Sequence, residues 1–340
     1  MRVKLEDVCE RGTSSLMQKD IVDKNGKYPV YGASGRIGSM ETYQQEHQTV
    51  AVVKDGAGIG RTMLLPEKSS VIGTMQYLIP KNCIESEYLY YVVKYMHLEK
   101  YFSGATIPHI YFRDYKTEEF NLHDKTEQRE IVSTLKRIEA IISNRQEQLT
   151  KLDELVKARF VEMFGDPKLN PYRFPCNSLS TYITFLTSGS RGWSQYFTDS
   201  GEYFITIKNV KNCKITLQDV QYVAPPDNAE AKRTKVQKND LLISITADLG
   251  RTGVVTEEIA NHGAYINQHL TCIRLKDEQV NPLYVAYYME SDAGKEQFTA
   301  KNQSAVKAGL NFNAINSLKL MAPPLSLQNQ FADFVAEVDK

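Results

Sequence analysis

The chain has 340 residues, of which 42% are hydrophobic and 24% are charged, and its formal net charge is zero. This length suffices for two domains with separate cores, and no run approaches the roughly 18 apolar residues of a membrane span. The first residues, Met1–Asp7, lack the apolar core of a signal peptide, so we expect a cytoplasmic protein without membrane association. Nucleic-acid binders usually carry a basic excess, so a DNA surface would need local clustering of cations.

Disulfide and metal chemistry are not indicated by the cysteines and histidines. The number of cysteines is odd, no two form a CxxC pair, and the histidines show no HExxH spacing. We therefore expect a reduced chain that holds no metal and no cofactor of its own. The cysteines are Cys9, Cys83, Cys176, Cys213 and Cys272.

In chain order, the first predicted elements are short strands separated by turns such as Lys24–Lys27. The apolar run Val50–Val53 precedes the glycine-rich stretch Gly56–Gly60. Such glycines can cradle a phosphate where a strand turns into a helix, but here the strand-like residues 61–65 follow. We favour a structural hairpin over a nucleotide site.

A helix is predicted over residues 126–164, with Thr126 as its N-cap and Gly165-Asp166-Pro167 as its stop. At about 1.5 Å per residue it would be about 58 Å long. Apolar residues spaced alternately by four and three form a seam, which favours packing against another helix over an exposed helix. Arg145 and Arg159 interrupt this seam. Its apolar members are Ile131, Leu135, Ile138, Ile142, Leu149, Leu152, Val156 and Met163.

The second half of the chain repeats the first. Residues 50–62 resemble residues 241–252, and both stretches end in Gly-Arg-Thr. Gln76-Tyr77-Leu78 then resembles Gln268-His269-Leu270, Tyr88 and Tyr91 match Tyr284 and Tyr287, and Thr126-Glu127-Gln128 matches Ser326-Leu327-Gln328.

The ordered matches predict an α+β fold with two homologous domains built on curved antiparallel sheets. The expected boundaries are residues 1–125, the helix 126–164, residues 165–325, and a short second helix 326–340. The second helix is shorter than the first, so most of the first helix would lack a partner within the chain. Either the chain is truncated, or a second chain covers the seam.

Candidate DNA contacts are polar, aromatic and basic side chains in loops. Arg bonds guanine bidentately, and Gln or Asn can bond adenine in the same way. The candidates are Tyr31, Ser34, Arg36, Lys54, Arg61, Gln76, Tyr77 and His109 in the first half, and Ser190, Arg191, Trp193, Lys208, Asn209, Lys211, Arg251, Gln268, His269, Lys301, Gln303 and Ser304 in the second.

Two of these candidates and one further motif have alternative interpretations. Arg61 and Arg251 repeat in register and suit a structural hydrogen bond as well as a phosphate contact. Asn281-Pro282-Leu283-Tyr284 is one residue from the NPPY-type motif of adenine methyltransferases, but no donor-binding glycine loop accompanies it, and we interpret it as a helix start. No PD-(D/E)xK or Walker A pattern is present, so we predict no catalytic residues.

Three stretches resemble the specificity subunits of Type I restriction-modification enzymes. They are residues 155–167 at the end of the predicted helix, residues 126–132 at its start, and residues 310–315 continuing through 323–331 before the second helix. The resemblance covers essentially the whole chain. It implies two target-recognition domains on an antiparallel helical pair, which read a bipartite site in double-stranded DNA without an active site.

The resemblance also implies partners. Two modification subunits would bind S-adenosylmethionine and methylate adenine, and restriction subunits, where present, would use ATP to translocate and cut DNA. Each recognition domain would read a few base pairs, and the helix would set the gap between them. The alternatives are a methyltransferase or nuclease with its own active site, a specificity-like subunit of another phage-defence system, and a homodimeric coiled-coil scaffold.

Overall fold

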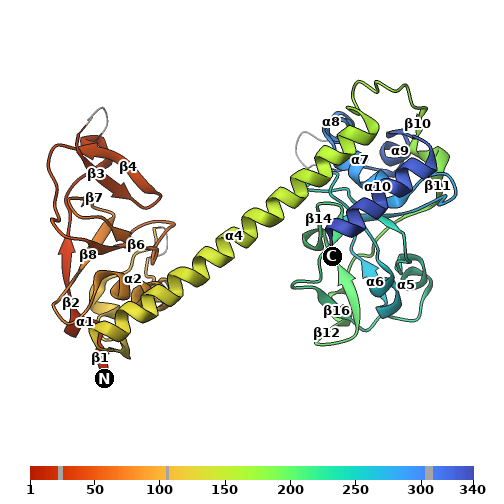
Figure 1. Ribbon diagram of the computed structural model, residues 1–340. Coiled ribbons are helices and arrows are strands. Elements are labelled where there is room, and N and C mark those ends of the chain that lie inside the picture. Colours follow the sequence, from red (N-terminus) through yellow and green to blue (C-terminus); the bar gives the residue numbers. More distant parts are fainter. Residues whose placement is uncertain (22–25, 105–106, 303–308) are drawn as a thin grey trace. The chain divides into compact units, whose positions relative to one another are not determined.

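The computed structural model describes residues 1–21, 26–104, 107–302 and 309–340 (Figure 1). The chain divides into two compact units, Met1–Gln146 (unit 1) and Glu147–Lys340 (unit 2). A single helix, α4 (Lys125–Phe164, 40 residues), contributes its first part to unit 1 and its last part to unit 2. Both units mix helices with short strands, which confirms the predicted α+β class.

Unit 1 is built on a four-stranded antiparallel sheet in the order β2-β8-β5-β6. Beside it lies a three-stranded sheet, β4-β3-β7, in which β3 and β7 run parallel, a pairing that the sequence did not predict. The strands are β1 (Arg2–Lys4), β2 (Cys9–Thr13), β3 (Tyr28–Gly32), β4 (Gly35–Met40), β5 (Thr49–Val53), β6 (Thr62–Leu65), β7 (Ser70–Val71), β8 (Met75–Pro80) and β9 (Glu119–Asn121). The helices before α4 are α1 (Leu5–Val8), α2 (Ser86–Tyr95) and α3 (Phe112–Tyr115).

Strand β5 is buried on both faces because its residues alternate between two apolar clusters. Val50 and Val52 pack with α2 and the start of α4, including Leu89 and Val132. The intervening Ala51 and Val53 pack with the β7 and β8 side chains of the second cluster. This explains why the strand reads as an unbroken apolar run.

Unit 2 repeats this arrangement with a four-stranded antiparallel sheet in the order β11-β20-β17-β18. A second sheet, β12-β16-β13-β19, again contains one parallel pair, β13 with β19. The strands are β10 (Cys176–Ser178), β11 (Ile183–Ser188), β12 (Phe197–Thr198), β13 (Glu202–Ile205), β14 (Val210–Lys211), β15 (Lys214–Ile215), β16 (Gln221–Val223), β17 (Leu241–Ser244), β18 (Thr252–Val254), β19 (Ala264–Ile266), β20 (Leu270–Leu275) and β21 (Lys319–Met321). The helices after α4 are α5 (Ala229–Thr234), α6 (Glu257–His262), α7 (Pro282–Glu290), α8 (Asp292–Lys301), α9 (Phe312–Asn316) and α10 (Leu325–Val338).

The two units also share their internal hydrogen bonds. The fully buried Gln128 accepts from the backbone N–H of Glu85 at 2.8 Å, and the fully buried Gln328 accepts from that of Asn281 at 2.9 Å. The Tyr88 and Tyr284 hydroxyls donate to backbone carbonyls, each at 2.8 Å. The glutamine bonds join the start of α2 to α4 and the start of α7 to α10, and the tyrosine bonds join α2 to β9 and α7 to β21. These matched elements confirm the internal repeat.

Helix α4 begins one residue earlier than predicted, and its cap is Asp124 rather than Thr126. The Asp124 carboxylate accepts from the backbone N–H groups of Thr126 and Glu127, both at 2.9 Å. Glu127 in turn accepts from the Asp124 N–H at 3.3 Å, which completes a capping box. The helix ends at Phe164, where Gly165 adopts a left-handed φ of +74°.

The predicted seam is covered at its ends but not in its middle. Ile131 and Leu135 pack on the core of unit 1, and Val156 and Met163 pack on the core of unit 2. The four apolar seam positions between them are exposed, with fractions of 47%, 63%, 57% and 39% for Ile138, Ile142, Leu149 and Leu152.

Within unit 2, the face of α4 that packs on the core also differs from the prediction. Phe160 and Phe164, which lie outside the seam, are buried, and their rings contact Phe331 of α10 at centroid distances of 5.3 and 5.6 Å. Arg159 of the seam lies over the Phe334 ring at 5.7 Å. Helix α10, predicted to begin at Ser326, begins one residue earlier and lies along the end of α4 (Figure 1).

Candidate nucleic-acid interface

Each unit carries a hairpin that follows a buried central strand. In unit 1 the hairpin joins β5 to β6, and in unit 2 it joins β17 to β18. Val53 and Ser244 close the two turns with matching backbone bonds, accepting from Gly60 at 2.9 Å and from Gly250 at 3.0 Å. Both glycines adopt a left-handed φ, +80° and +79°, which a residue with a Cβ rarely does. The glycine-rich stretch is therefore a structural hairpin, as predicted.

A second chain segment supports each hairpin from the same side. The Ile110 N–H donates to the Lys54 carbonyl, and the Leu310 N–H donates to the Ile245 carbonyl, each at 2.9 Å. Isolated bridges pair Asp55 with His109 and Thr246 with Gly309. The backbone frame is therefore the same in both units, and it presents the residues that follow the central strand.

In unit 1 this frame presents three polar side chains. The His109 Nδ1 lies 2.7 Å from the Asp55 carboxylate, and the Lys54 ammonium lies 3.7 Å from it. Their side chains are 37%, 28% and 29% exposed for His109, Asp55 and Lys54. They are thus held in place and still accessible to a ligand.

An exposed aromatic and basic strip continues from this cluster. The Tyr111 ring stacks near His109 at a centroid distance of 6.3 Å, and the Arg113 guanidinium lies 4.7 Å from the Tyr111 centroid.

Arg61 donates to the Ala33 carbonyl at 2.7 Å, which ties the hairpin to the turn bearing the exposed Ser34 and Arg36. Tyr31 pairs with Arg36 across that β3–β4 turn.

In unit 2 the equivalent frame presents different side chains. The Thr246 hydroxyl lies 2.7 Å from His269 Nδ1, and the Gln268 amide nitrogen lies 3.1 Å from His269 Nε2. Arg251 pairs with Asp248 inside the hairpin. Both repeated arginines therefore make structural contacts, one of the two roles that the sequence left open for them.

Five predicted DNA contacts lie inside the units instead of on their surfaces, with exposed fractions of 3% or less: Gln76, Tyr77, Ser190, Trp193 and Asn209. Gln76 bonds the Tyr115 hydroxyl, and the Tyr77 hydroxyl donates to Gln44 at 2.7 Å. A buried side chain cannot reach a base edge, so direct contact by these five residues disagrees with the structure.

The buried candidates of unit 2 have similar structural roles. Trp193 packs against Phe204 and Tyr265 at centroid distances of 5.7 and 5.1 Å. Asn209 accepts from the Thr206 N–H at 3.0 Å and so caps a short turn, and Ser190 pairs with Asn267 in an isolated bridge.

The other candidates have accessible side chains or lie outside the described residues. Arg191, Lys208 and Lys211 are exposed, and Lys301 at the end of α8 is partly buried. Lys208 lies in the short turn before β14 and Lys211 is the last residue of β14, and neither is among the hairpin contacts given above. Gln303 and Ser304 lie outside the described residues.

Sequence reasoning missed Asp55, Tyr111 and Arg113 of unit 1. It also missed the exposed Arg233 of α5, whose guanidinium donates to the Ser188 carbonyl at 2.8 Å. Asp55 directly follows Lys54, which was among the predicted DNA contacts. The position of Asp55 just after the apolar strand Val50–Val53 could have identified it from the sequence. Tyr111 and Arg113 follow the selected His109 by two and four residues, and the bridge between His109 and Asp55 brings this segment to the hairpin.

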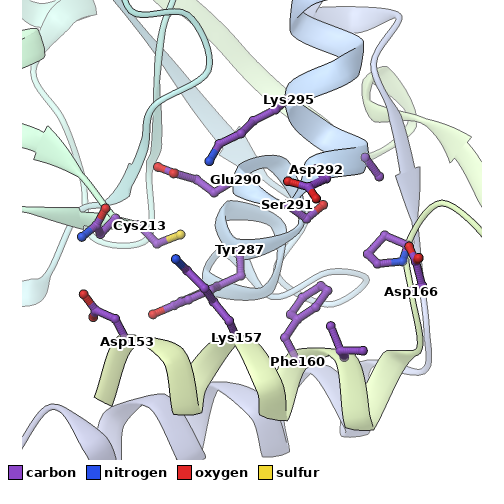
Figure 2. Close-up of a pocket in the computed structure, with 14 residues that line it drawn as sticks. Asp153, Lys157, Phe160, Asp166, Cys213, Tyr287, Glu290, Ser291, Asp292 and Lys295 are labelled. Carbon is purple, nitrogen blue, oxygen red and sulfur yellow. The ribbon is translucent and has the colours of Figure 1, made fainter. Parts of the chain in front are cut away.

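Unit 2 also contains a cavity of about 400 Å³ beside the C-terminal part of α4 (Figure 2). Its lining combines the Lys157 and Lys295 ammonium groups with four carboxylates, the Tyr287 ring and the Cys213 thiol. Burial raises the pKa of Cys213, and the nearby Glu290 raises it further, so this thiol stays protonated at neutral pH. Glu290 is itself engaged, accepting from the Thr252 N–H at 2.9 Å. The Cys213 thiol is thus not activated as a nucleophile, and we take the accessible hairpins as the candidate site.

The methyltransferase-like tetrapeptide has a structural role. The Asn281 side chain accepts from the backbone N–H of Leu283 at 2.9 Å and caps α7, with Pro282 in the first turn. This confirms the predicted helix start. Among the described residues, no helix combines the length and apolar character needed to cross a bilayer.

Comparison with known proteins adds to this description. Residues 1–153 and 194–340 match the model of the Type I restriction modification DNA specificity domain. The Type I restriction enzyme EcoBI specificity subunit of Escherichia coli is 20% identical over 140 residues, which span 41% of this chain and 28% of that protein.

Two solved structures share the fold over the whole chain. The S subunit of a Type I restriction-modification system from M. genitalium aligns over 89% of its length with a TM-score of 0.58 and 16% identity. A chain from a structural study of assembly and conformational transition in a type I R-M system aligns over 90% of its length with a TM-score of 0.51 and 16% identity. With matches to the family model in both halves, the chain belongs to the Type I restriction-modification DNA specificity domain family.

Proposed function

We propose that this chain is the DNA-reading subunit of a Type I restriction-modification complex and recognises a bipartite site in double-stranded DNA. The observation that carries the proposal is the repeated frame, in which two units of the same strand order present accessible polar side chains on equivalent hairpins. Each unit would read one half-site in the major groove, where base pairs differ in their donor and acceptor patterns.

In this proposal, α4 determines the number of base pairs between the half-sites. A continuous helix of 40 residues is about 60 Å long at about 1.5 Å per residue. Inserting seven residues between Ile142 and Leu149, where the apolar side chains are exposed, would lengthen it by about 10.5 Å. At about 3.4 Å per base pair, this equals about three base pairs.

The test is selection of bound sequences from a random double-stranded DNA pool, with the full chain and with the insertion variant. We expect a two-part motif from the full chain, and from the variant the same half-motifs with a wider gap or no paired binding. Ser143→Ala, an exposed position in the same stretch of α4, is the control without a length change. A pool without any enriched motif would refute DNA reading, and an unchanged gap in the insertion variant would refute the spacer role.

Partner subunits are the second part of the proposal. The exposed Ile138, Ile142, Leu149 and Leu152 are apolar side chains that a partner would cover, and a modification subunit or a second copy of the chain would fit them. S-adenosylmethionine would bind to the two modification subunits, and ATP would bind to restriction subunits. Leu149→Lys should leave the folded chain intact and reduce its co-purification with modification subunits.

A further inference from the structure

We propose that Lys54 and Asp55 form a specificity-determining pair that reads one G·C base pair in the half-site of unit 1. This inference rests on the proposed function, because it assumes that the hairpin of unit 1 faces the major groove. It adds which side chains distinguish the bases and which base pair they select.

The first support is the exchange of side chains on a constant frame. The two hairpins keep their closing backbone bonds, their left-handed glycine and the chain segment that supports them. Yet the accessible Lys54 and Asp55 of unit 1 are replaced in unit 2 by Ile245, which is buried in the core of that unit, and by Thr246. The frame itself therefore does not require a charged pair at these two positions. Two domains that read different sequences need the same frame with different side chains.

The second support is the position of a carboxylate among basic side chains. Asp55 lies within 4 Å of both Lys54 and His109, and the strip with Tyr111 and Arg113 continues from it. A surface that binds only phosphates gains nothing from a carboxylate, because like charges repel. A carboxylate in a major-groove surface finds its donor on a base, and the amino group N4 of cytosine is the usual one.

The third support is the order of donor and acceptor. A G·C pair presents the guanine acceptors N7 and O6 beside the cytosine donor N4. Lys54 supplies a donor and Asp55 an acceptor, with 3.7 Å between their charged atoms. An A·T pair also offers an amino group and single acceptors at adenine N7 and thymine O4, but it lacks the two adjacent acceptors of guanine that a lysine ammonium bonds. The bond from His109 at 2.7 Å holds the carboxylate in place before DNA arrives.

The experiment is sequence selection from a random DNA pool with the full chain and three variants. Asp55→Asn keeps the size of the side chain but gives it a donor as well as acceptors. Glu99→Gln removes an exposed carboxylate near the same hairpin and is the matched control. Gln268→Ala in unit 2 identifies which half-motif belongs to that unit. Circular dichroism and thermal unfolding verify that each variant is folded.

We expect Asp55→Asn to lower the preference for G·C at one position of one half-motif by about tenfold or more, and to leave the other half-motif unchanged. Glu99→Gln should keep the wild-type motif. The inference is overturned if Asp55→Asn weakens all sequences equally, leaves every position unchanged, or alters the half-motif that Gln268→Ala alters. A wild-type chain that selects no motif contradicts the proposed function itself, so the two failures are distinguishable.

Discussion

Replacing Gln128 by alanine should lower the free energy of unfolding of unit 1 by much more than replacing an exposed polar residue would. Gln128 is fully buried and makes three hydrogen bonds, accepting from Glu85 N–H at 2.8 Å and donating to the carbonyls of Cys83 and His123 at 3.0 and 2.9 Å. At roughly 1 kcal/mol for each net hydrogen bond, with buried groups left unpaired, the loss should be about 2–4 kcal/mol. That is a large part of the roughly 5–15 kcal/mol that stabilises a domain.

Guanidinium unfolding followed by circular dichroism measures this loss, and hydrogen exchange locates it. Exchange should accelerate in α2 and in the first turns of α4, while unit 2 keeps its protection. Glu130→Ala, an exposed position two residues away, is the control and should change the free energy of unfolding by less than about 0.5 kcal/mol. The matched variant Gln328→Ala removes two hydrogen bonds of unit 2, with Asn281 and Pro323, and should produce a smaller loss there. If Gln128→Ala is as stable as Glu130→Ala, the reasoning from buried hydrogen bonds is wrong.

Two further predictions concern the helix faces. Phe160→Ala should cost unit 2 about 3–5 kcal/mol because the ring is buried among Phe164, Tyr284 and Phe331, whereas Val161→Ala, 51% exposed, should have little effect in the same unfolding assay. In unit 1, hydrogen bonds from Lys94 and Tyr91 lower the pKa of Glu139 below its ordinary 4.5. The ionised Glu139 therefore stabilises unit 1 fully above pH 4.5, and this stabilisation is lost as the pH falls through the lowered pKa. Unit 1 of a Glu139→Gln variant should therefore lose less stability than wild type between about pH 5 and pH 3; a steeper loss in the variant would contradict this sign.

Sequence patterns predicted those parts of the fold that depend on periodicity and repetition. The ordered matches paired β5 with β17 and α2 with α7 as equivalent elements of the repeat. The spacing of apolar residues predicted the start of α4 to within one residue. Asn281 was identifiable as a cap because its side chain acts on the backbone two residues away. Such local effects leave a direct trace in the sequence.

Long-range effects left a weaker trace. Tyr77 has the character of a DNA contact in the sequence, but its hydroxyl accepts from the Val71 N–H at 2.8 Å and donates to Gln44, 33 residues away, at 2.7 Å. Phe160 and Phe164 were missed because the packing face within unit 2 follows a spacing of four rather than the alternating seam. Asp55 acquires its His109 partner across 54 residues of sequence.

The exposed middle of α4 has a consequence for where a protease cleaves the chain. From Ile138 to Leu152 the exposed apolar side chains have no core to hold them, and an isolated helical segment of this length is marginal in water. Brief opening there would admit trypsin at Arg145 or Lys151, while the sheets on either side stay closed. Limited digestion should then release two compact fragments, and a bound partner that seals this stretch would delay the cut.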